Sequence, residues 1–574
     1  MSDDQLESNL LAELRALDIA RSRFQIENPG TPIEHEDPDV RRMVEALAFS
    51  AVRTRHATLR NLQATWRRLL STYFKFMLQP LPAMAMVQAQ VTARMSESAA
   101  LPRGTTLQLK TLDGTIGSFK TLAELNVIPM TLSRCETLLR PQGFRVVLTF
   151  TSQYPRGEDI GVLRLYIHYL DNYLAALRVQ HQLEHHLQRC IAVYNAAVDD
   201  ELSGPECEVS FGAHFDAPHE ADTTNPLERA RTFFHFPEQD LFVNIRVPPS
   251  PRTWKRLSLC FDLNEDWPRD PPLYRENFRP FAVPIVNMHR SFAQPIECDG
   301  TKDSHPILYI EDDDSFALHQ TYGVYRTTPD GMEPLAAAAL GDLRPTYEVE
   351  EGGAYEGSPG YSLVVRMPEA FANPEQLLID ASWYQPGFAQ HAIGPLKVAL
   401  LDRNVTGLDW QSVGPVRAAL ECPLREDPER LLYLLSLKMK PVLDKEELVE
   451  LLSMLGSVAV GAYRELPERL RDLSIEVVPD GTLRGAGIRH IYHGMMKKPA
   501  KEEEPLVARF VKQLGIILDA WDYEARVEIV PQYGGGPLPT SVRRKNETSL
   551  VDSSRWPSRG PSSEPPSDPE EQPL

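Results

Sequence analysis

The feature that most constrains the fold is a long N-terminal segment whose apolar side chains recur at helical spacing. The segment begins at Pro38, which suits a first helical turn, and Asp37 before it can cap the free backbone N–H groups. Pro80 and Pro82 end it. An advance of about 100° per residue places the apolar side chains on one broad face. These side chains are Val40, Met43, Val44, Leu47, Ala48, Ala51, Val52, Leu59, Leu62, Trp66, Leu69, Leu70 and Tyr73.

A helix of this length would extend about 60 Å, which exceeds an ordinary domain helix. Two interpretations remain open: a core helix interrupted near residues 54–57, or a helix that lies against partner chains in a bundle. A periodic helix longer than about 25 residues is typical of a bundle or coiled coil. Each apolar side chain would contribute roughly 1.5–3 kcal/mol when buried, so we expect another surface to cover this face. The residues predicted to contact a partner are Leu59, Leu62, Trp66, Leu69 and Tyr73.

The composition is that of a large globular protein with an acidic net charge. The chain has 574 residues, enough for roughly three or four domains. It carries 60 Lys and Arg against 80 Asp and Glu, a net charge of −20, which opposes binding to nucleic acid or anionic lipid. The longest apolar run, residues 451–463, is shorter than the ~20 residues of a membrane span. The acidic N-terminus does not resemble a signal peptide. We therefore expect a cytoplasmic protein with neither a nucleic-acid partner nor direct membrane insertion.

The six cysteines lie far apart, and the chain has no C-x-x-C pair. A disulfide scaffold would need denser cysteines, and a structural zinc site would need paired spacing. We interpret the cysteines as reduced thiols, most of them buried, and we expect no metal or cofactor. The residues are Cys135, Cys190, Cys207, Cys260, Cys298 and Cys422.

After Pro82 the pattern changes to short strand-like stretches, and helical spacing returns near the C-terminus. We expect strands at residues 87–93, 105–110, 116–121, 144–151, 163–170, 233–236, 241–247, 257–263 and 525–530. We expect helices at residues 173–197, 427–439, 445–455 and 506–520. The predicted fold class is α+β. The predicted divisions are an N-terminal helical bundle region (1–82), a β-rich body with an inserted helix (83–270), a β-rich middle domain (271–420), an α/β C-terminal domain (421–533) and a disordered Pro- and Ser-rich tail (534–574).

One pattern could support catalysis. His181, Glu184 and His185 fit the H-x-x-E-H motif of inverted zinc peptidases, in which two histidines bind zinc and the glutamate acts as base. The competing interpretation is a polar surface helix, because neither a third ligand nor a second signature is evident. The acidic run at 311–314 lacks the spacing of an EF-hand loop, and phosphate-binding and serine-hydrolase motifs are absent from the sequence. We predict that the protein is not an enzyme, and a zinc-dependent hydrolase remains the alternative.

A second alternative is a glycan-binding module that uses exposed tryptophans. Trp254, Trp267 and Trp383 lie among prolines and charged residues. Tryptophans in such surroundings more often pack beneath loops than face a ligand, so we expect these three to be buried.

Several short motifs resemble those of the TssF family of the type VI secretion system, in the same order. They lie between residues 36 and 300, and the likeness thins beyond that point. The motifs are Glu36-Asp37-Pro38-Asp39-Val40, Pro80-Leu81-Pro82-Ala83-Met84 with Val87-Gln88, Leu101-Pro102-Arg103-Gly104-Thr105, Phe119-Lys120-Thr121, Phe236-Pro237-Glu238 with Leu241-Phe242, residues 281–288, and Ala293-Gln294-Pro295-Ile296.

The resemblance implies a structural wedge subunit of a phage-like contractile baseplate. It implies a long N-terminal helix followed by β-rich domains and a mixed C-terminal region. By this likeness two copies of the chain would join one TssG-like subunit, and six such wedges would surround a spike hub. TssE-like and TssK-like proteins would contact the wedge. The complex would stand at the cytoplasmic side of the inner membrane.

Overall fold

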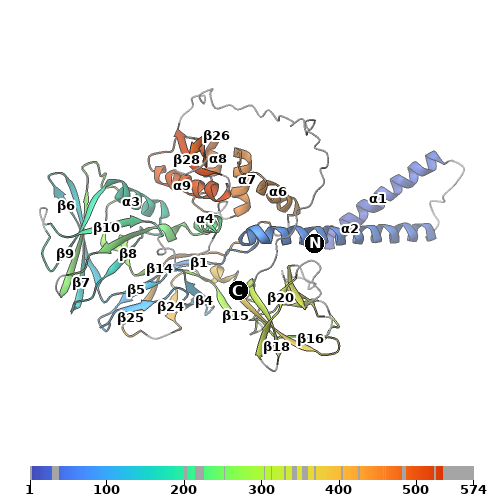
Figure 1. Ribbon diagram of the computed structural model, residues 1–574, viewed down its shortest axis with the longest axis horizontal. Coiled ribbons are helices and arrows are strands. Elements are labelled where there is room, and N and C mark those ends of the chain that lie inside the picture. Colours follow the sequence, from blue (N-terminus) through green and yellow to red (C-terminus); the bar gives the residue numbers. More distant parts are fainter. Residues whose placement is uncertain are drawn as a thin grey trace, which may run out of the picture.

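The computed structural model describes residues 3–28, 38–198, 203–213, 225–250, 253–302, 304–311, 313–328, 331–338, 345–351, 360–367, 370–402, 405–424, 427–456, 458, 461–480, 487–522 and 525–533. An arm of two helices, α1 (Asp3–Glu27) and α2 (Pro38–Leu78), projects from a body of several β-sheets and a C-terminal α/β unit (Figure 1). The expected tail at 534–574 lies outside the described residues.

The arm contains the predicted long helix. α2 runs through residues 54–57 without interruption, so of the two interpretations left open, the core helix interrupted there is wrong. The backbone instead leaves helical geometry at Phe74 (φ −135°, ψ 42°), where the helix enters the body. α1 packs against α2. The position of the kink follows from packing, because Phe74 is buried while residues on the outer part of α2 face solvent.

A closed six-stranded barrel lies at the centre of the body. Its strands come from three distant parts of the chain, in the order β1–β14–β4–β3–β24–β25. Their bounds are β1 Met84–Val91, β3 Thr106–Lys110, β4 Ile116–Thr121, β14 Ala282–Val286, β24 Lys397–Leu400 and β25 Leu408–Arg417. A short pair beside them is formed by β2 (Ala99–Leu101) and β5 (Leu125–Val127). The barrel therefore combines strands from two predicted units, 83–270 and 271–420. In this part of the structure, consecutive stretches of the chain do not form separate units.

An eight-stranded antiparallel sheet forms the largest layer, at the left of Figure 1. Its order is β13–β8–β11–β10–β9–β12–β7–β6. Gly143 closes the β6–β7 hairpin at φ +120°, where a Cβ would lie 2.2 Å from the carbonyl oxygen of Leu263. The strands are β6 Thr131–Arg140, β7 Gly143–Arg156, β8 Gly161–Ile167, β9 Leu187–Tyr194, β10 Glu206–Phe211, β11 Phe242–Val247, β12 Trp254–Leu263 and β13 Phe278–Pro280.

Two helices of this region depart from the sequence-based expectation. α3 (Tyr173–His186) ends where the predicted helix 173–197 continues, because the following residues pair with β12 as strand β9. α4 (Pro226–His235) occupies the place of the strand predicted at 233–236, and the 3-10 turn η1 (Pro237–Asp240) follows it. Asn225 caps α4 by accepting a hydrogen bond from the backbone N–H of Leu227 at 2.9 Å, and Pro226 occupies the first turn.

A separate β-unit follows the barrel strand β14 and returns to the barrel at β24. Its two sheets enclose a second core that includes Leu318, Leu363, Leu377 and Trp383. The first sheet contains β15 His289–Phe292, β16 Ile296–Cys298, β18 Ala317–Thr328, β19 Gly331–Pro334 and β23 Glu375–Tyr384. The second contains β17 Ser304–Pro306, β20 Ala336–Ala337, β21 Thr346–Glu351 and β22 Tyr361–Arg366. The 3-10 turn η2 (Arg275–Asn277) precedes β13, and the short helix α5 (Phe388–His391) follows β23.

The C-terminal unit combines helices with a three-stranded sheet. β27 and β28 are parallel, and α9 is the crossover between them. The side chains of α9 continue the core that begins at the base of α2. The elements are α6 Pro428–Lys438, α7 Lys445–Leu455, α8 Leu466–Arg469, β26 Leu470–Asp480, β27 Gly487–Met496, α9 Glu504–Trp521 and β28 Arg526–Tyr533.

A buried carboxylate joins three arginines in the large sheet. Asp262 on β12 contacts Arg145 (2.7 Å), Arg140 (2.7 Å) and Arg189 (2.8 Å). Burial raises the pKa of Asp262, but the hydrogen bonds from Arg145 and Arg189 outweigh it, so the pKa lies below its ordinary value. The charge of Arg145, itself fully buried, is thereby neutralised.

We predict that Asp262→Ala destabilises the large sheet by about 3–5 kcal/mol, because it leaves Arg145 buried without its counter-ion. Chemical denaturation of both proteins at pH 7 measures this difference. The folded-state pKa is lowered, so the stabilisation is present above the unfolded pKa of about 4 and is lost as the pH falls through the folded value. Glu208→Gln, which breaks the exposed pair with Arg246, is the control and should change stability by less than about 1 kcal/mol. Equal effects of the two substitutions would contradict the prediction.

Candidate assembly interface

The base of α2 is fixed by aromatic packing against the C-terminal unit. Leu70, Phe74 and Met77 are buried there. The ring of Phe74 stacks on Trp521 of α9, with the centroids 5.5 Å apart and the planes at 9°. The ammonium group of Lys438 lies 5.9 Å from the Phe74 ring and 6.0 Å from the Trp521 ring, within reach of a cation–π interaction.

Arg231 on α4 also binds the C-terminal end of α2. Its Nη2 donates to the carbonyl of Gln79 at 2.9 Å, and its Nη1 donates to the carbonyl of Phe76. Its Nε donates to the carbonyl of Leu455, the last residue of α7, at 3.0 Å. Burial lowers the pKa of Arg231 to about 10, so the guanidinium remains charged at neutral pH. A buried cation thus satisfies the free carbonyls at two helix C-termini, where the helix dipole favours positive charge.

The segment after α2 is held by His235. Its Nε2 lies 3.1 Å from the carbonyl oxygen of Pro82, and because a carbonyl only accepts, this nitrogen carries the proton. Burial lowers the pKa of His235 to about 4, so the ring is neutral at pH 7.

α2 also contacts the separate β-unit. Arg68 pairs with Glu348 on β21, with Nη2 and Oε2 2.7 Å apart, and Gln79 donates to Gln320 on β18 at 2.9 Å. The base of the arm is therefore connected to α4, the β-unit and the C-terminal unit, which gives the arm a defined direction.

The predicted contact residues lie on the part of α2 that leaves the body. Leu62 is 42% exposed, Leu69 is 51% exposed and Tyr73 is 58% exposed, whereas Trp66 is half-buried. The side chain of Leu59 lies outside the described residues. Further out, Met43, Leu47 and Phe49 are exposed, and a shallow groove is lined by Leu47, Ser50, Ala51, Thr54, Arg55 and Thr58.

The chain itself covers part of the apolar face. Ala48 and Val52 are buried on α2, and α1 packs against this helix. Sequence reasoning placed α1 within a helical region without resolving it as a separate helix. Leu6, Leu10, Leu14 and Leu17, spaced three or four residues apart, could have indicated it.

The zinc hypothesis has little support in the geometry. α3 places the rings of His181 and His185 4.6 Å apart between centroids. Burial, with a further contribution from His185, lowers the pKa of His181. Among the residues that the structure describes, no three His, Cys, Asp or Glu side chains are grouped so that they could hold a metal ion.

The other residues singled out in the sequence serve packing. Trp254, Trp267 and Trp383 are buried, as predicted, and so do not present their faces to a glycan. All six cysteines are reduced thiols, five of them buried and Cys135 half-buried, as predicted. Asp312 of the acidic run lies outside the described residues. Of the helices that the structure describes, none combines the length and hydropathy needed to span a membrane.

Comparison with known families identifies the chain. The family described as "Type VI secretion system, TssF" matches residues 30–361, which is more than half of the sequence. The chain belongs to the TssF family. The resemblance inferred from the short motifs is thereby confirmed, and none of the curated proteins matches the sequence significantly.

Two solved structures resemble this TssF-family chain in fold. One is from the type VI secretion system TssK-TssF-TssG baseplate subcomplex, with a TM-score of 0.70 and 14% identity over 86% of this chain and 96% of that chain. The other is from the baseplate complex of the type VI secretion system, with a TM-score of 0.58 and 16% identity over 92% of this chain and 96% of that chain. The predicted α+β, multi-domain, baseplate-wedge-like fold is confirmed.

Replacing Arg231 tests how the arm is held. We predict that Arg231→Met destabilises the protein by at least about 1–3 kcal/mol, because buried carbonyls at the ends of α2 and α7 lose their donor. The peptide bonds around residues 79–82 should become more sensitive to limited proteolysis. Arg229→Met, at an exposed position of the same helix, is the matched control and should behave as the wild type. Unchanged proteolysis in Arg231→Met would contradict this role.

Acidification should weaken the same junction. The folded-state pKa of His235 is about 4 and the unfolded value is about 6.5, so the unfolded state binds a proton first as the pH falls. Stability is therefore greatest above pH 6.5 and decreases on the order of 2–3 kcal/mol towards pH 4. His235→Gln keeps a donor for Pro82 and should flatten this part of the pH profile of the unfolding midpoint. An unaltered profile would contradict the assignment.

Proposed function

We propose that this TssF-family protein is a structural subunit of a type VI secretion baseplate, and that its arm packs against other subunits. The proposal rests on the exposed apolar surface of α2. The C-terminal end of this helix is fixed by contacts with several parts of the body. The related folds come from a TssK-TssF-TssG subcomplex and a baseplate complex. By that likeness the partners are a TssG-like subunit, a second copy of this chain, and TssE-like and TssK-like proteins. Assembly takes place at the cytoplasmic side of the inner membrane.

The contact surface is formed by the exposed Leu62, Leu69 and Tyr73 and by the half-buried Trp66. Burying the exposed half of a large apolar side chain contributes roughly 1 kcal/mol. Several such residues on one rigid helix are enough to stabilise a helical bundle with partner subunits. α1 leaves these side chains exposed, so it does not substitute for such partners.

Charge complementarity supports contact between copies. α2 carries eight Lys and Arg but two Asp and Glu, although the whole chain is acidic. α1 carries six Asp and Glu but three Arg. The basic outer surface of α2 in one copy therefore attracts acidic helices such as α1 of another copy, and long-range attraction of this kind mainly raises the association rate.

A structural role, without catalysis, suits the same observations. The supporting evidence is the membership of the TssF family and the fixed arm. The tryptophans and cysteines that were considered as binding residues are mostly buried in the core. The hydrolase alternative, built on His181, Glu184 and His185, gains nothing from the comparisons.

A double substitution on the arm tests the proposal. Leu62→Asp with Trp66→Asp should leave the body folded but weaken recovery of the complex with a co-expressed TssG-like subunit by at least about 100-fold. Each substitution removes roughly 1 kcal/mol of apolar burial and adds an unpaired charge, whose burial costs more. Size-exclusion chromatography with affinity co-purification measures the loss, and circular dichroism verifies the fold.

Asn61→Asp with Thr65→Asp is the matched control, since both positions are exposed on the same turns of α2. It adds the same charge without removing apolar side chains and should preserve the complex. Wild-type recovery of the complex by the Leu62 and Trp66 variant would refute the role of the arm.

A further inference from the structure

The large eight-stranded sheet consists of two halves that meet at one short ladder. β6, β7, β9 and β12 form one half, and β8, β10, β11 and β13 form the other. Among the residues that the structure describes, two registered pairs join β9 to β10: Ile191 with Glu206, and Cys190 with Cys207. From Glu208 onward, β10 pairs with β11 instead. Two cysteines are therefore direct cross-strand partners at the junction between the halves.

The backbone places these two cysteines at a separation that suits a disulfide. The N–H of Ala192 donates to the carbonyl of Pro205 at 2.9 Å. Hydrogen-bonded pairs recur at every second residue of an antiparallel ladder, so Cys190 and Cys207 also form such a pair. The Cα atoms of such a pair lie about 5.5 Å apart, within the range of roughly 4.4–6.8 Å that disulfides require. A bond between the two sulfurs thus needs no large movement of the backbone.

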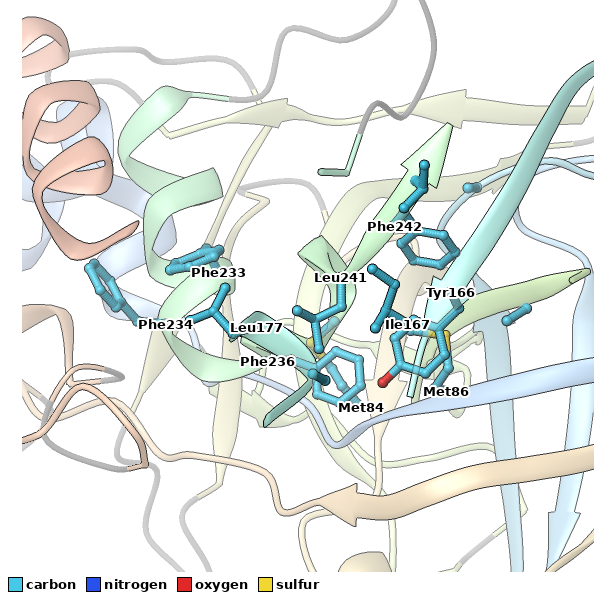
Figure 2. Packing of buried hydrophobic residues seen from close by; sticks show 14 of the residues in the cluster. Met84, Met86, Tyr166, Ile167, Leu177, Phe233, Phe234, Phe236, Leu241 and Phe242 are labelled. Atoms are coloured by element: carbon cyan, nitrogen blue, oxygen red, sulfur yellow. The ribbon is translucent and has the colours of Figure 1, made fainter. Parts of the chain in front are cut away.

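Both cysteine side chains lie on the same face of the sheet. Residues directly opposite each other in an antiparallel pair share a face, and Cys190 and Cys207 both belong to the main hydrophobic core. Figure 2 shows part of this core, where Tyr166 of β8 and Phe242 of β11 pack with their ring centroids 5.4 Å apart. Cys260 on β12 is the partner of the residue after Cys190 and belongs to a separate cluster on the other face.

The two thiols differ in their tendency to ionise. A hydrogen bond from Cys190 lowers the pKa of Cys207, and burial and the charge of Glu206 oppose this effect without cancelling it. The same hydrogen bond, together with burial, raises the pKa of Cys190. The thiolate is the reactive form of cysteine, so Cys207 is the thiol that an oxidant attacks first.

Access to the pair favours a small and uncharged oxidant. Cys190 is 1% exposed and Cys207 is 5% exposed, whereas Glu206 and Glu208 on either side of Cys207 are exposed. These carboxylates repel anionic oxidants such as glutathione disulfide, and the buried position excludes bulky ones. Hydrogen peroxide is small and neutral. Because the ladder between β9 and β10 is short, local opening at Cys207 costs less than in the middle of a long ladder.

We propose that Cys190 and Cys207 form an oxidisable dithiol, which hydrogen peroxide converts to a disulfide between the two halves of the sheet. The Cys207 thiolate attacks one peroxide oxygen, the O–O bond breaks, and a sulfenic acid and hydroxide form. The hydroxide takes up the proton that Cys207 lost on ionisation. The sulfur of Cys190 then attacks the sulfur of Cys207, and the S–O bond breaks as the S–S bond forms. The hydroxyl group leaves with the proton of the Cys190 thiol as water, so two electrons pass from the two cysteines to the peroxide.

The disulfide acts as a reversible link within the body of the protein. In the reduced protein the halves are held at this point by the short ladder between β9 and β10. In the oxidised protein a covalent bond prevents their separation there until a thiol reductant cleaves it. This inference concerns the large sheet and is independent of the arm and its partners.

Peroxide treatment of the full-length protein tests the proposal. Thiol titration under denaturing conditions should count two fewer free thiols after treatment, and dithiothreitol should restore them. Peptide mass spectrometry should find the peptide with Cys190 joined to the peptide with Cys207. Hydrogen exchange of the backbone amides at 190–192 and 206–208 should become at least tenfold slower in the oxidised protein. Glutathione disulfide at the same concentration should form the bond at least tenfold more slowly than peroxide.

Cys260→Ala is the matched control, because it removes a buried cysteine from the other face of the same sheet and should leave the cross-link unchanged. In Cys190→Ala, dimedone should trap Cys207 as its sulfenic acid, whereas in Cys207→Ala it should label Cys190 at least tenfold less. An unchanged thiol count would overturn the proposal, as would a cross-link between other cysteines or unchanged exchange at the junction. Equal rates with peroxide and glutathione disulfide would overturn the assigned oxidant.

Discussion

The guanidinium of Arg231 joins parts of the chain that lie far apart in sequence. From α4 it donates to backbone carbonyls at the end of α2 and at the end of α7, and it does so from a buried position. Three acceptors on one charged group offset much of the cost of removing that charge from water. Phe74 and Trp521 then fill the remaining space by stacking. The direction of the arm, and with it the presentation of its apolar face, depends on this junction.

An exposed apolar helix is useful in assembly when its position is defined before partners arrive. A flexible helix would lose conformational entropy on binding, whereas a helix fixed at its base loses less. α1 stabilises α2 along part of its length and leaves Leu62, Leu69 and Tyr73 exposed. The two helices of the arm carry opposite net charges, acidic on α1 and basic on α2.

The features of the fold that depend on neighbouring residues, such as the start of a helix or a short strand, were predictable from the sequence. Residues 116–121 form β4, residues 445–455 form α7, and the long helix begins at Pro38 as its proline and apolar spacing indicate. α4 was mistaken for a strand because Phe233, Phe234 and Phe236 have high strand propensity, while the cap at Asn225 decides the local structure. Residues after His186 continue a helical pattern, yet pairing with β12 makes them a strand.

The sequence by itself determined the α+β class, the helical arm and the resemblance to the TssF family, since periodic apolar spacing and ordered short motifs are properties of neighbouring residues. Only the tertiary structure decided that one barrel draws β1, β14 and β25 from three distant regions. It also decided which apolar residues of α2 are buried by the chain and which are left exposed. The physical reason is that strand pairing, burial and the carbonyls bound by Arg231 are set by contacts between segments that are hundreds of residues apart, and local spacing carries no information about them.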